Sequence, residues 1–257
     1  MTKQSIFLTL NRKSFKGENG TILVIGGSER YTGAPIFTAL GSLRSGSDLV
    51  YIFTTQNALI TVKSLHEAIV VPIQFDKFIL NKITACVIGP GLGILEKDEI
   101  DLIKQISEYL NDRNVPFVLD ADAIHLYKHN MFRSLKTCIL TPNFKEAKEL
   151  TPENHHFCIY KGEIDIVKHQ NSIVEISTPS SLKRCGGQGD ILSGILGTAI
   201  SIEKSDIMNA CISSCELMRK SSSQAFALKG FSLIASDIFQ SLTNVLSTET
   251  TNNYDRM

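Results

Sequence analysis

Short β-branched runs alternate with helix-like stretches through the first 150 residues, and this alternation restricts the chain to few folds. The runs indicate buried parallel strands and cover residues 21–27, 48–55, 68–73, 84–89, 116–120 and 137–141. The stretches between them are long enough for crossover helices and cover residues 33–45, 97–110, 121–129 and 144–150. The alternation predicts a doubly wound α/β fold, with a mostly parallel sheet flanked by helices.

After residue 155 the pattern changes to three short strands. The tight breaks KGE and HQN separate runs at 157–160, 164–168 and 172–176, so we expect a short antiparallel meander at one edge of the sheet. From Gln188 the pattern is helical to about Leu246. No repeat or linker divides the chain, so we predict a single domain over 1–257, with a solvated amino-terminal arm at 1–16 and a frayed tail at 247–257.

Composition argues against several classes of partner. Lys plus Arg and Asp plus Glu are balanced at 26 each, so no global field favours nucleic acid or an anionic membrane. No run approaches the roughly 20 apolar residues that a membrane span needs. The six cysteines form no CxxC pair, which favours a reducing cytoplasm. Cys211 and Cys215 could share a metal on an expected helix, but burial as structural thiols is the better hypothesis.

The strongest local feature is the glycine-rich segment RCGGQGD at 184–190, which opens an apolar helix. Backbone N–H groups at such a helix start have no partner within the helix, so they can hold a phosphate or an oxyanion. Asp190 lies in the first turn, where it could be a simple cap. A carboxylate beside a phosphate is also suited to remove a proton or hold a metal. We expect a side chain at Gly187 to occupy the phosphate's space while the fold survives.

Two other polar segments follow predicted strands. In LTPNFKE, Asn143 and Glu146 have the spacing of a helix cap and its return partner, although the same pair could hold water around Mg²⁺. In VLDADA, an apolar strand ends in Asp120 and Asp122, and the carboxyl ends of strands in open α/β sheets face the ligand crevice. Asp120 is therefore a candidate site residue and Asp122 a candidate helix cap, unless both are solvated strand-end acids.

Taken in order, these segments resemble the ATP-dependent NAD(P)H-hydrate dehydratase family of the ribokinase-like superfamily. The similarity spans most of the chain and runs through ILVIGGSERYTGAP, VIGPGLG, VLDADAIHL, LTPNFKE, KGEID and RCGGQGDILSG. It implies a ribokinase-like fold and an enzyme that removes water from hydrated NADH or NADPH with ATP and Mg²⁺. The hydrate's hydroxyl would be phosphorylated and phosphate would then leave. The form RCGGQGD looks like the eukaryotic branch, which uses ATP rather than ADP.

The resemblance also implies roles for individual residues. It makes Asp190 the catalytic carboxylate beside an anion hole of Gly187, Gln188 and Gly189, and it gives Glu146 a place near Mg²⁺ through water. The residues that it implies for ATP binding are Lys161, Gly162, Glu163, Ile164, Asp165, Ser180, Ser181, Leu182, Lys183, Arg184, Cys185, Gly186, Gly187, Gln188 and Gly189. Those that it implies for the hydrated dinucleotide are Gly93, Asn143, Phe144, Lys145, Glu146, Ala147, Lys148, Glu149 and Asp190.

Two other functions compete with this interpretation. A vitamin or sugar kinase of the same superfamily would share the GGQGD loop but release a stable phosphorylated product, and YTGAP and GPGLG weigh against it. The second competing function is that of a catalytically silent nucleotide-binding regulator. The segment at 151–160 is shorter than the family's by a helix, and this loss could thin a wall of the nucleotide site. The intact Asp190 argues against a silent protein. We expect a separate epimerase acting on the same metabolite, while the chain could itself be a homo-oligomer.

Overall fold

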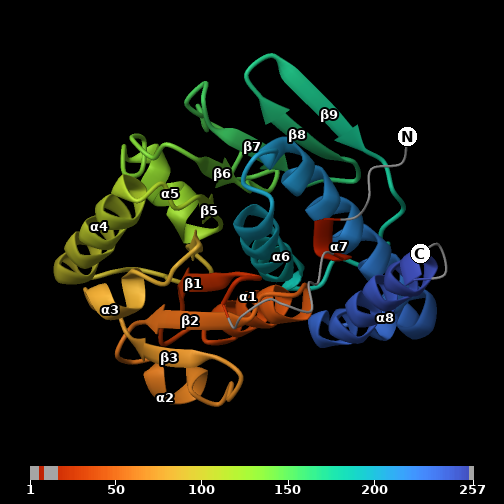
Figure 1. Ribbon diagram of the computed structural model, residues 1–257, viewed down its shortest axis with the longest axis horizontal. Coiled ribbons are helices and arrows are strands. Elements are labelled where there is room, and N and C mark those ends of the chain that lie inside the picture. Colours follow the sequence, from red (N-terminus) through yellow and green to blue (C-terminus); the bar gives the residue numbers. More distant parts are fainter. Residues whose placement is uncertain (1–5, 9–16, 255–257) are drawn as a thin grey trace.

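The computed structural model describes residues 6–8 and 17–254, with the side chains of residue 8 and of residues 249–254 left out. Within these residues the strands form one sheet in the order β3-β2-β1-β4-β5-β6-β7-β8-β9 (Figure 1). Neighbouring strands are parallel from β3 through β7, and the pairs β7–β8 and β8–β9 are antiparallel. The strands are β1 (Thr21–Ile25), β2 (Leu49–Thr54), β3 (Ile69–Pro72), β4 (Ala85–Ile88), β5 (Phe117–Leu119), β6 (Cys138–Leu140), β7 (Phe157–Tyr160), β8 (Asp165–His169) and β9 (Ser172–Ile176). The predicted doubly wound sheet and its antiparallel edge are confirmed.

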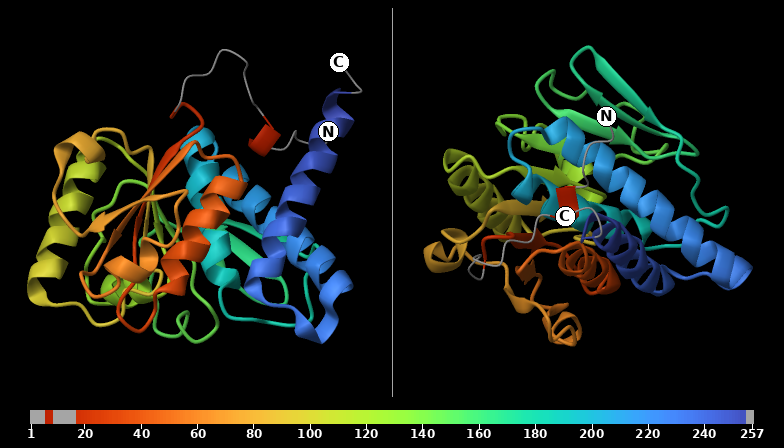
Figure 2. Two further views of the ribbon diagram at one scale, coloured as in Figure 1. Left: turned by 90° about the horizontal axis from the view of Figure 1, so that it is seen from below. Right: turned by 45° about the vertical axis from the view of Figure 1, so that its right-hand side comes forward.

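Helices cover both faces of this sheet, as the left view of Figure 2 shows for α4 on one side and for α1 and α8 on the other. The α-helices are α1 (Gly33–Arg44), α2 (Leu59–Val62), α3 (Lys77–Leu80), α4 (Lys97–Asp112), α5 (Asp122–Lys128), α6 (Gln188–Ile202), α7 (Ile207–Lys229) and α8 (Ala235–Tyr254). Short 3₁₀ turns are formed by Ile6–Leu8 and Gly230–Ser232. None of the helices in the described part of the chain is long and apolar enough to cross a bilayer.

The side chains of each central strand are divided between two cores, one on each face of the sheet. In β1, Ile22 and Val24 belong to the cluster with α1, α6, α7 and α8, whereas Leu23 and Ile25 belong to the cluster with α4 and α5. All four are fully buried. Strands covered on both faces lose the polar half of the usual alternation, which is why they read as continuous apolar runs in the sequence.

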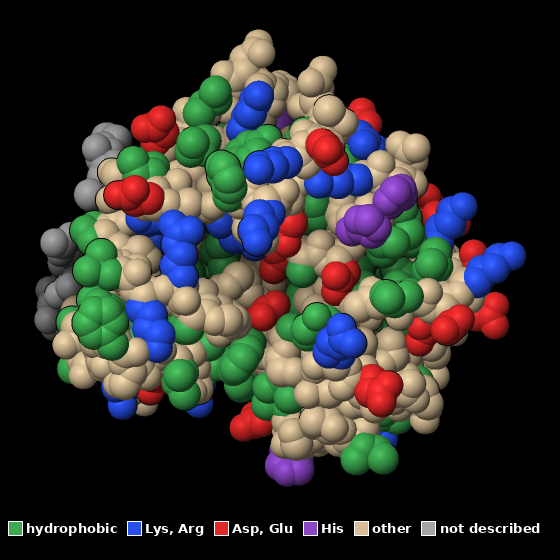
Figure 3. Space-filling model, turned by 180° about the vertical axis from the view of Figure 1, so that it is seen from behind, with side chains coloured by type: hydrophobic (Ala, Val, Ile, Leu, Met, Phe, Trp, Pro, Cys, Tyr) green, Lys and Arg blue, Asp and Glu red, His purple; other side chains and the backbone are tan. Residues whose placement is uncertain are grey.

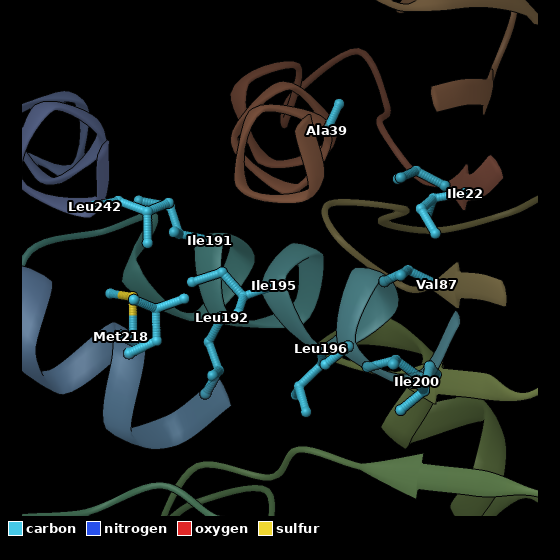
Figure 4. Close-up of a cluster of buried hydrophobic side chains, with 14 of the residues drawn as sticks. Ile22, Ala39, Val87, Ile191, Leu192, Ile195, Leu196, Ile200, Met218 and Leu242 are labelled. Atoms are coloured by element: carbon cyan, nitrogen blue, oxygen red, sulfur yellow. The ribbon is translucent and has the colours of Figure 1, made fainter. Parts of the chain in front are cut away.

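Helix α6 is almost entirely buried, and it fixes the position of the glycine-rich loop that precedes it. Its residues Ile191, Ile195 and Ile200 are fully buried, and Figure 4 shows them between α1, α8 and the sheet. Helix α1 approaches so closely that a Cβ on Gly194 would lie 2.0 Å from the backbone oxygen of Thr38. Because this packing holds α6 tightly, the first turn of the helix has a defined place at the end of the sheet.

The chain reverses its direction of winding between β1 and β4, which are neighbours in the sheet. The loops that follow these two strands meet there, since the Gly27 amide donates to the Pro90 carbonyl at 2.9 Å. A Cβ on Gly26 would lie only 2.4 Å from that carbonyl oxygen, so the contact requires glycine. Ligands of open α/β sheets bind at such a switch point, beyond the carboxyl ends of the strands.

The described residues differ from the sequence expectations in three segments. Residues 144–150 form turns rather than an α-helix, because Glu149 adopts a left-handed conformation with φ 63° that ends the first turn. In the amino-terminal arm, the side chain of Ile6 is 7% exposed and packs in the core, while the rest of 1–16 apart from residues 6–8 lies outside the described residues. Of the tail expected to fray at 247–257, residues 247–254 are helical, and residues 255–257 lie outside the described residues.

Candidate functional site

The start of α6 has the geometry expected of an anion site. Gly187 precedes the helix in a left-handed conformation, with φ 97°, and no side chain caps the helix. The first amides of α6 therefore have no carbonyl partner within the helix. The reason given for Gly187 from the sequence is wrong, however. A Cβ there would lie 2.8 Å from both Phe37 and Ala235 rather than in the phosphate's space, so glycine is required by packing and by φ.

The segment before α6 is tied to the helix by the side chain of Gln188. Its Nε2 donates to Ser181 Oγ and to the Lys183 carbonyl, both at 3.2 Å. Ser181 Oγ also donates to the Lys183 carbonyl at 2.7 Å. The side chain of Gln188 thus shapes the loop, and only its backbone amide is available to an anion hole.

An ion pair between a half-buried lysine and a buried aspartate joins the ends of β5 and β7 beside this helix start. Lys161 Nζ lies 2.7 Å from Asp120 Oδ1, which also accepts a hydrogen bond of 2.7 Å from Thr141 Oγ1. A Cβ on Gly189 would lie 3.3 Å from Lys161 Nζ and 3.9 Å from Asp120 Oδ2. Lys161, Asp120 and the first turn of α6 therefore meet at one point, although they are far apart in the sequence.

Strained backbone supports the two acids that follow β5. Ala121, between Asp120 and Asp122, has φ 46° and ψ −116°, a conformation that non-glycine residues rarely adopt and that is often found at functional sites. Asp122 is not the helix cap expected from the sequence. Its Oδ2 instead accepts a hydrogen bond of 2.7 Å from the Gly93 amide, which links the loop after β4 to the start of α5.

The segment after β6 confirms the cap and return partner expected from its sequence. Asn143 Oδ1 accepts hydrogen bonds from the amides of Lys145 and Glu146 at 2.9 and 3.0 Å, and Glu146 Oε2 accepts one from the Asn143 amide at 2.9 Å. Phe144 is 76% exposed. Together these contacts leave an exposed aromatic ring beside a carboxylate that is oriented by the backbone.

The electrostatics of the cluster single out Asp190. Burial, together with the charges of Asp120 and Asp122 and against the opposing charge of Lys161, raises the pKa of Asp190 to about 7. Burial, Asp120 and Asp122 also raise the pKa of Glu146. Burial alone would lower the pKa of Lys161, but its contacts with Asp120, Glu146 and Asp190 outweigh it and the pKa is raised. Asp190 is therefore poised to exchange a proton near neutral pH, beside a lysine that stays charged.

The donor set fits Mg²⁺ held mainly through water. Asp120, Asp122, Glu146 and Asp190 offer carboxylate oxygens, the ligands that Mg²⁺ prefers. Nowhere in the described part of the chain do three acidic, His or Cys side chains come close enough together to bind a metal directly. Because Mg²⁺ usually keeps several waters and binds substrate phosphates, Glu146 fits a position in its outer sphere.

A hollow lies near the middle of the face shown in Figure 3, with Asp and Glu side chains gathered in it and Lys and Arg side chains along one rim. Negative charge in a hollow repels a nucleotide unless protons, metal ions or lysines offset it. The mixture of charges therefore suits a site that handles phosphate and protons together.

The structure brings most of the sequence-predicted site residues to one end of the sheet. Gly93 follows β4, the segment 143–149 follows β6, the segment 161–165 connects β7 to β8, and the segment 180–189 leads into α6. Sequence reasoning missed Thr141, which holds Asp120, and the pairing of Asp120 with Lys161. A polar residue at the end of an apolar strand was the available signal for Thr141.

Five of the six cysteines are buried, and Cys185 is half-buried.

Comparison with known proteins identifies the family to which this architecture corresponds. The sequence model described as NAD(P)H-hydrate dehydratase matches residues 22–156 and 155–244. The chain is similar to the ATP-dependent (S)-NAD(P)H-hydrate dehydratase of Entamoeba histolytica, with 34% identity over 94% of this chain and 91% of the relative. The protein of that name from Danio rerio is 32% identical over 91% of this chain and 84% of the relative.

A solved structure supports the fold. The ADP/ATP-dependent NAD(P)H-hydrate dehydratase from Bacillus subtilis, co-crystallized with ATP/Mg²⁺, has a TM-score of 0.74 and 20% sequence identity. The match covers 95% of this chain and 96% of that chain. At this level of identity the likeness concerns the fold, which confirms the ribokinase-like arrangement expected from the sequence motifs.

Proposed function

The chain belongs to the NAD(P)H-hydrate dehydratase family, and we propose that it uses ATP to remove water from the (S) hydrates of NADH and NADPH. The observation that carries this proposal is the position of Asp190. Its carboxyl has a pKa raised to about 7 by burial and by neighbouring acids, and it stands in the first turn of a helix whose amides can hold a phosphate. In a protein that only bound nucleotide, such an acid would lower the affinity for the phosphate groups.

The first step transfers the γ-phosphoryl group of ATP to the hydroxyl of the hydrate. The hydroxyl oxygen attacks the γ-phosphorus, its proton passes to Asp190, and the bond to the ADP oxygen breaks. The amides of Gly187, Gln188 and Gly189 and the ammonium of Lys161 stabilise charge on the transferring group. Mg²⁺, when bound near Glu146, would neutralise further phosphate charge.

The second step restores the reduced nicotinamide. The bond between the ring carbon and the phosphorylated oxygen breaks, phosphate leaves with that oxygen, and a proton leaves the neighbouring ring carbon as the double bond forms. Water is thus removed at the expense of ATP, with ADP and inorganic phosphate as the other products. Gly93 and the segment 143–149 are proposed to hold the hydrated ring and its dinucleotide.

Product analysis separates this function from that of a superfamily kinase. With hydrated NADH and ATP, the dehydratase yields one inorganic phosphate and one NADH for each ADP. A kinase would yield ADP and a stable phosphorylated nucleotide without inorganic phosphate. A silent regulator would yield neither product.

ATP is expected to support turnover at least several-fold better than ADP. The proposal rests on the loop around Arg184 and Cys185, which resembles that of the ATP-using branch, and on the ATP dependence named for both relatives. Initial rates with saturating hydrated NADH and equal concentrations of the two nucleotides measure the preference. Equal or faster turnover with ADP would overturn it.

The activity is expected to rise as the pH passes through about 7, because Asp190 must be deprotonated to accept the hydroxyl proton. Asp120→Asn removes a negative charge that raises the pKa of Asp190, so the rise should move to lower pH in that variant. Profiles of kcat/KM for hydrated NADH against pH, recorded at fixed ATP and Mg²⁺, measure both effects. An unchanged midpoint in Asp120→Asn would show that another group controls the profile.

The cellular setting belongs to the same proposal. We infer a cytoplasmic enzyme, in keeping with its unpaired cysteines. Because both relatives are named for the (S) hydrate, a separate epimerase would be needed to supply that form from the opposite one.

A further inference from the structure

A single buried guanidinium connects the first segment proposed to bind ATP, 161–165, with Thr178, two residues before the second segment, 180–189. Arg219 lies in α7, which packs along β8 and β9 (Figure 1). Its Nη2 donates to the carbonyl of Glu163 in the turn between β7 and β8, and its Nε donates to the carbonyl of Thr178 in the segment after β9. The two segments are otherwise separated by the β8–β9 hairpin, so this contact fixes one relative to the other.

The same side chain also controls the shape of the first segment through Asp165. Arg219 Nη1 lies 3.1 Å from Asp165 Oδ2, and Asp165 Oδ1 accepts a hydrogen bond of 3.0 Å from the Gly162 amide. The turn is anchored at its other end by the Lys161 amide, which donates to the Pro142 carbonyl at 3.1 Å. The guanidinium therefore fixes the part of the turn around Glu163 and Asp165, while Lys161 is held separately by Pro142 and Asp120.

The burial of this ion pair makes a purely stabilising role a poor explanation. The side chains of Arg219 and Asp165 are only 7% and 10% exposed. Taking two such charges out of water costs about as much as their attraction returns, so a buried pair is weak evidence for stability. What the pair supplies is geometry, because the planar fork of Arg reaches a carboxylate and two carbonyls in fixed directions and Lys cannot.

We infer that Arg219 is a positioning residue for ATP, which holds the segment 161–165 and, through Thr178, the segment 180–189 at the separation that the nucleotide requires. The inference rests on the proposed function, since it takes both segments as the nucleotide site. Arg219 acts through the backbone of these segments, and Asp165 is its partner. Loss of the contact should weaken ATP binding while the hydrate, which is proposed to lie against Gly93 and 143–149, is bound as before.

The first test is Arg219→Lys, which keeps a positive charge beside Asp165 but cannot reach both carbonyls. We expect the KM for ATP to rise at least about ten-fold, as the loss of hydrogen bonds to a charged group predicts, with kcat and the KM for hydrated NADH within about three-fold of wild type. Calorimetric titration with ATP and Mg²⁺ should show the same loss in Kd. The matched control is Lys220→Met, an exposed position on the same helix, which should change neither constant.

A second variant separates positioning from folding. In Arg219→Met/Asp165→Leu the buried pair is replaced by apolar side chains, which usually preserves stability. We expect a melting temperature near that of wild type together with the same loss of ATP affinity. Either variant overturns the inference if it folds and binds ATP within two-fold of wild type, and so does failure of both to fold. If the wild type binds ATP but does not dehydrate the hydrate, the proposed function fails while the Kd values still decide the role of Arg219.

Discussion

Replacing Asp190 with Asn is expected to lower turnover of hydrated NADH by about 10² to 10⁴-fold, the usual contribution of a positioned general base. Asn has nearly the same shape but cannot accept the hydroxyl proton. The structure removes the alternative that Asp190 serves as a helix cap, because its side chain accepts no hydrogen bond from the described residues and α6 begins without a side-chain cap. Initial rates of NADH formation at saturating ATP and hydrated NADH measure the loss in turnover.

The control for Asp190→Asn is its stability and its nucleotide affinity. Both should stay close to wild type, and ATP binding should rise slightly, because a negative charge near the γ-phosphate is removed. If the variant melts like wild type and turns over within about three-fold of it, Asp190 is not the proton acceptor and the mechanism is wrong.

Substitutions at Gly189 are expected to separate stability from activity. Gly189 has helical geometry, so Ala there restricts the unfolded chain and should stabilise the protein by about 0.4–1 kcal/mol. The added methyl group, however, would lie 3.3 Å from Lys161 Nζ and would push the ammonium away from its place beside Asp120 and Asp190. A displacement of about 1 Å in a reacting group can cost about 10²-fold in rate.

A graded series provides the measurement. Gly189→Ala should lose about ten-fold in kcat and Gly189→Val about 10²-fold or more, because Val adds two methyl groups toward the same ammonium. Thermal melting should place Gly189→Ala at or above wild type. Wild-type turnover in a folded Gly189→Val variant would show that the first turn of α6 lies away from the reaction.

The sheet could be predicted from the sequence because strands buried on both faces leave continuous apolar runs, as in residues 21–27 and 84–89. The helix expected at 144–150 could not be excluded in this way. Its cap at Asn143 is present, but the turn ends where Glu149 adopts φ 63° and Leu150 enters the core, 9% exposed. That choice depends on packing against distant residues, and local sequence signals carry no information about it.

The types of residue in the site could be predicted from the sequence, whereas the contacts between them mostly could not. Polar residues at strand ends, such as Asp120, were candidates because of where parallel strands finish. The contact of Asp120 with Lys161 depends on β5, β6 and β7 being neighbours, and the contact of Arg219 with Asp165 depends on the placement of α7. The requirement for glycine at 187 likewise comes from Phe37 and Ala235, which lie far away in the sequence.

The most direct test of the central claim is the absorbance of reduced nicotinamide when the purified protein is mixed with the (S) hydrate of NADH, ATP and Mg²⁺. The account predicts that absorbance rises until the hydrate is consumed, that the rise requires ATP, and that inorganic phosphate appears in equal amount. No rise in absorbance with protein that binds ATP, or a rise that is independent of ATP, would contradict it.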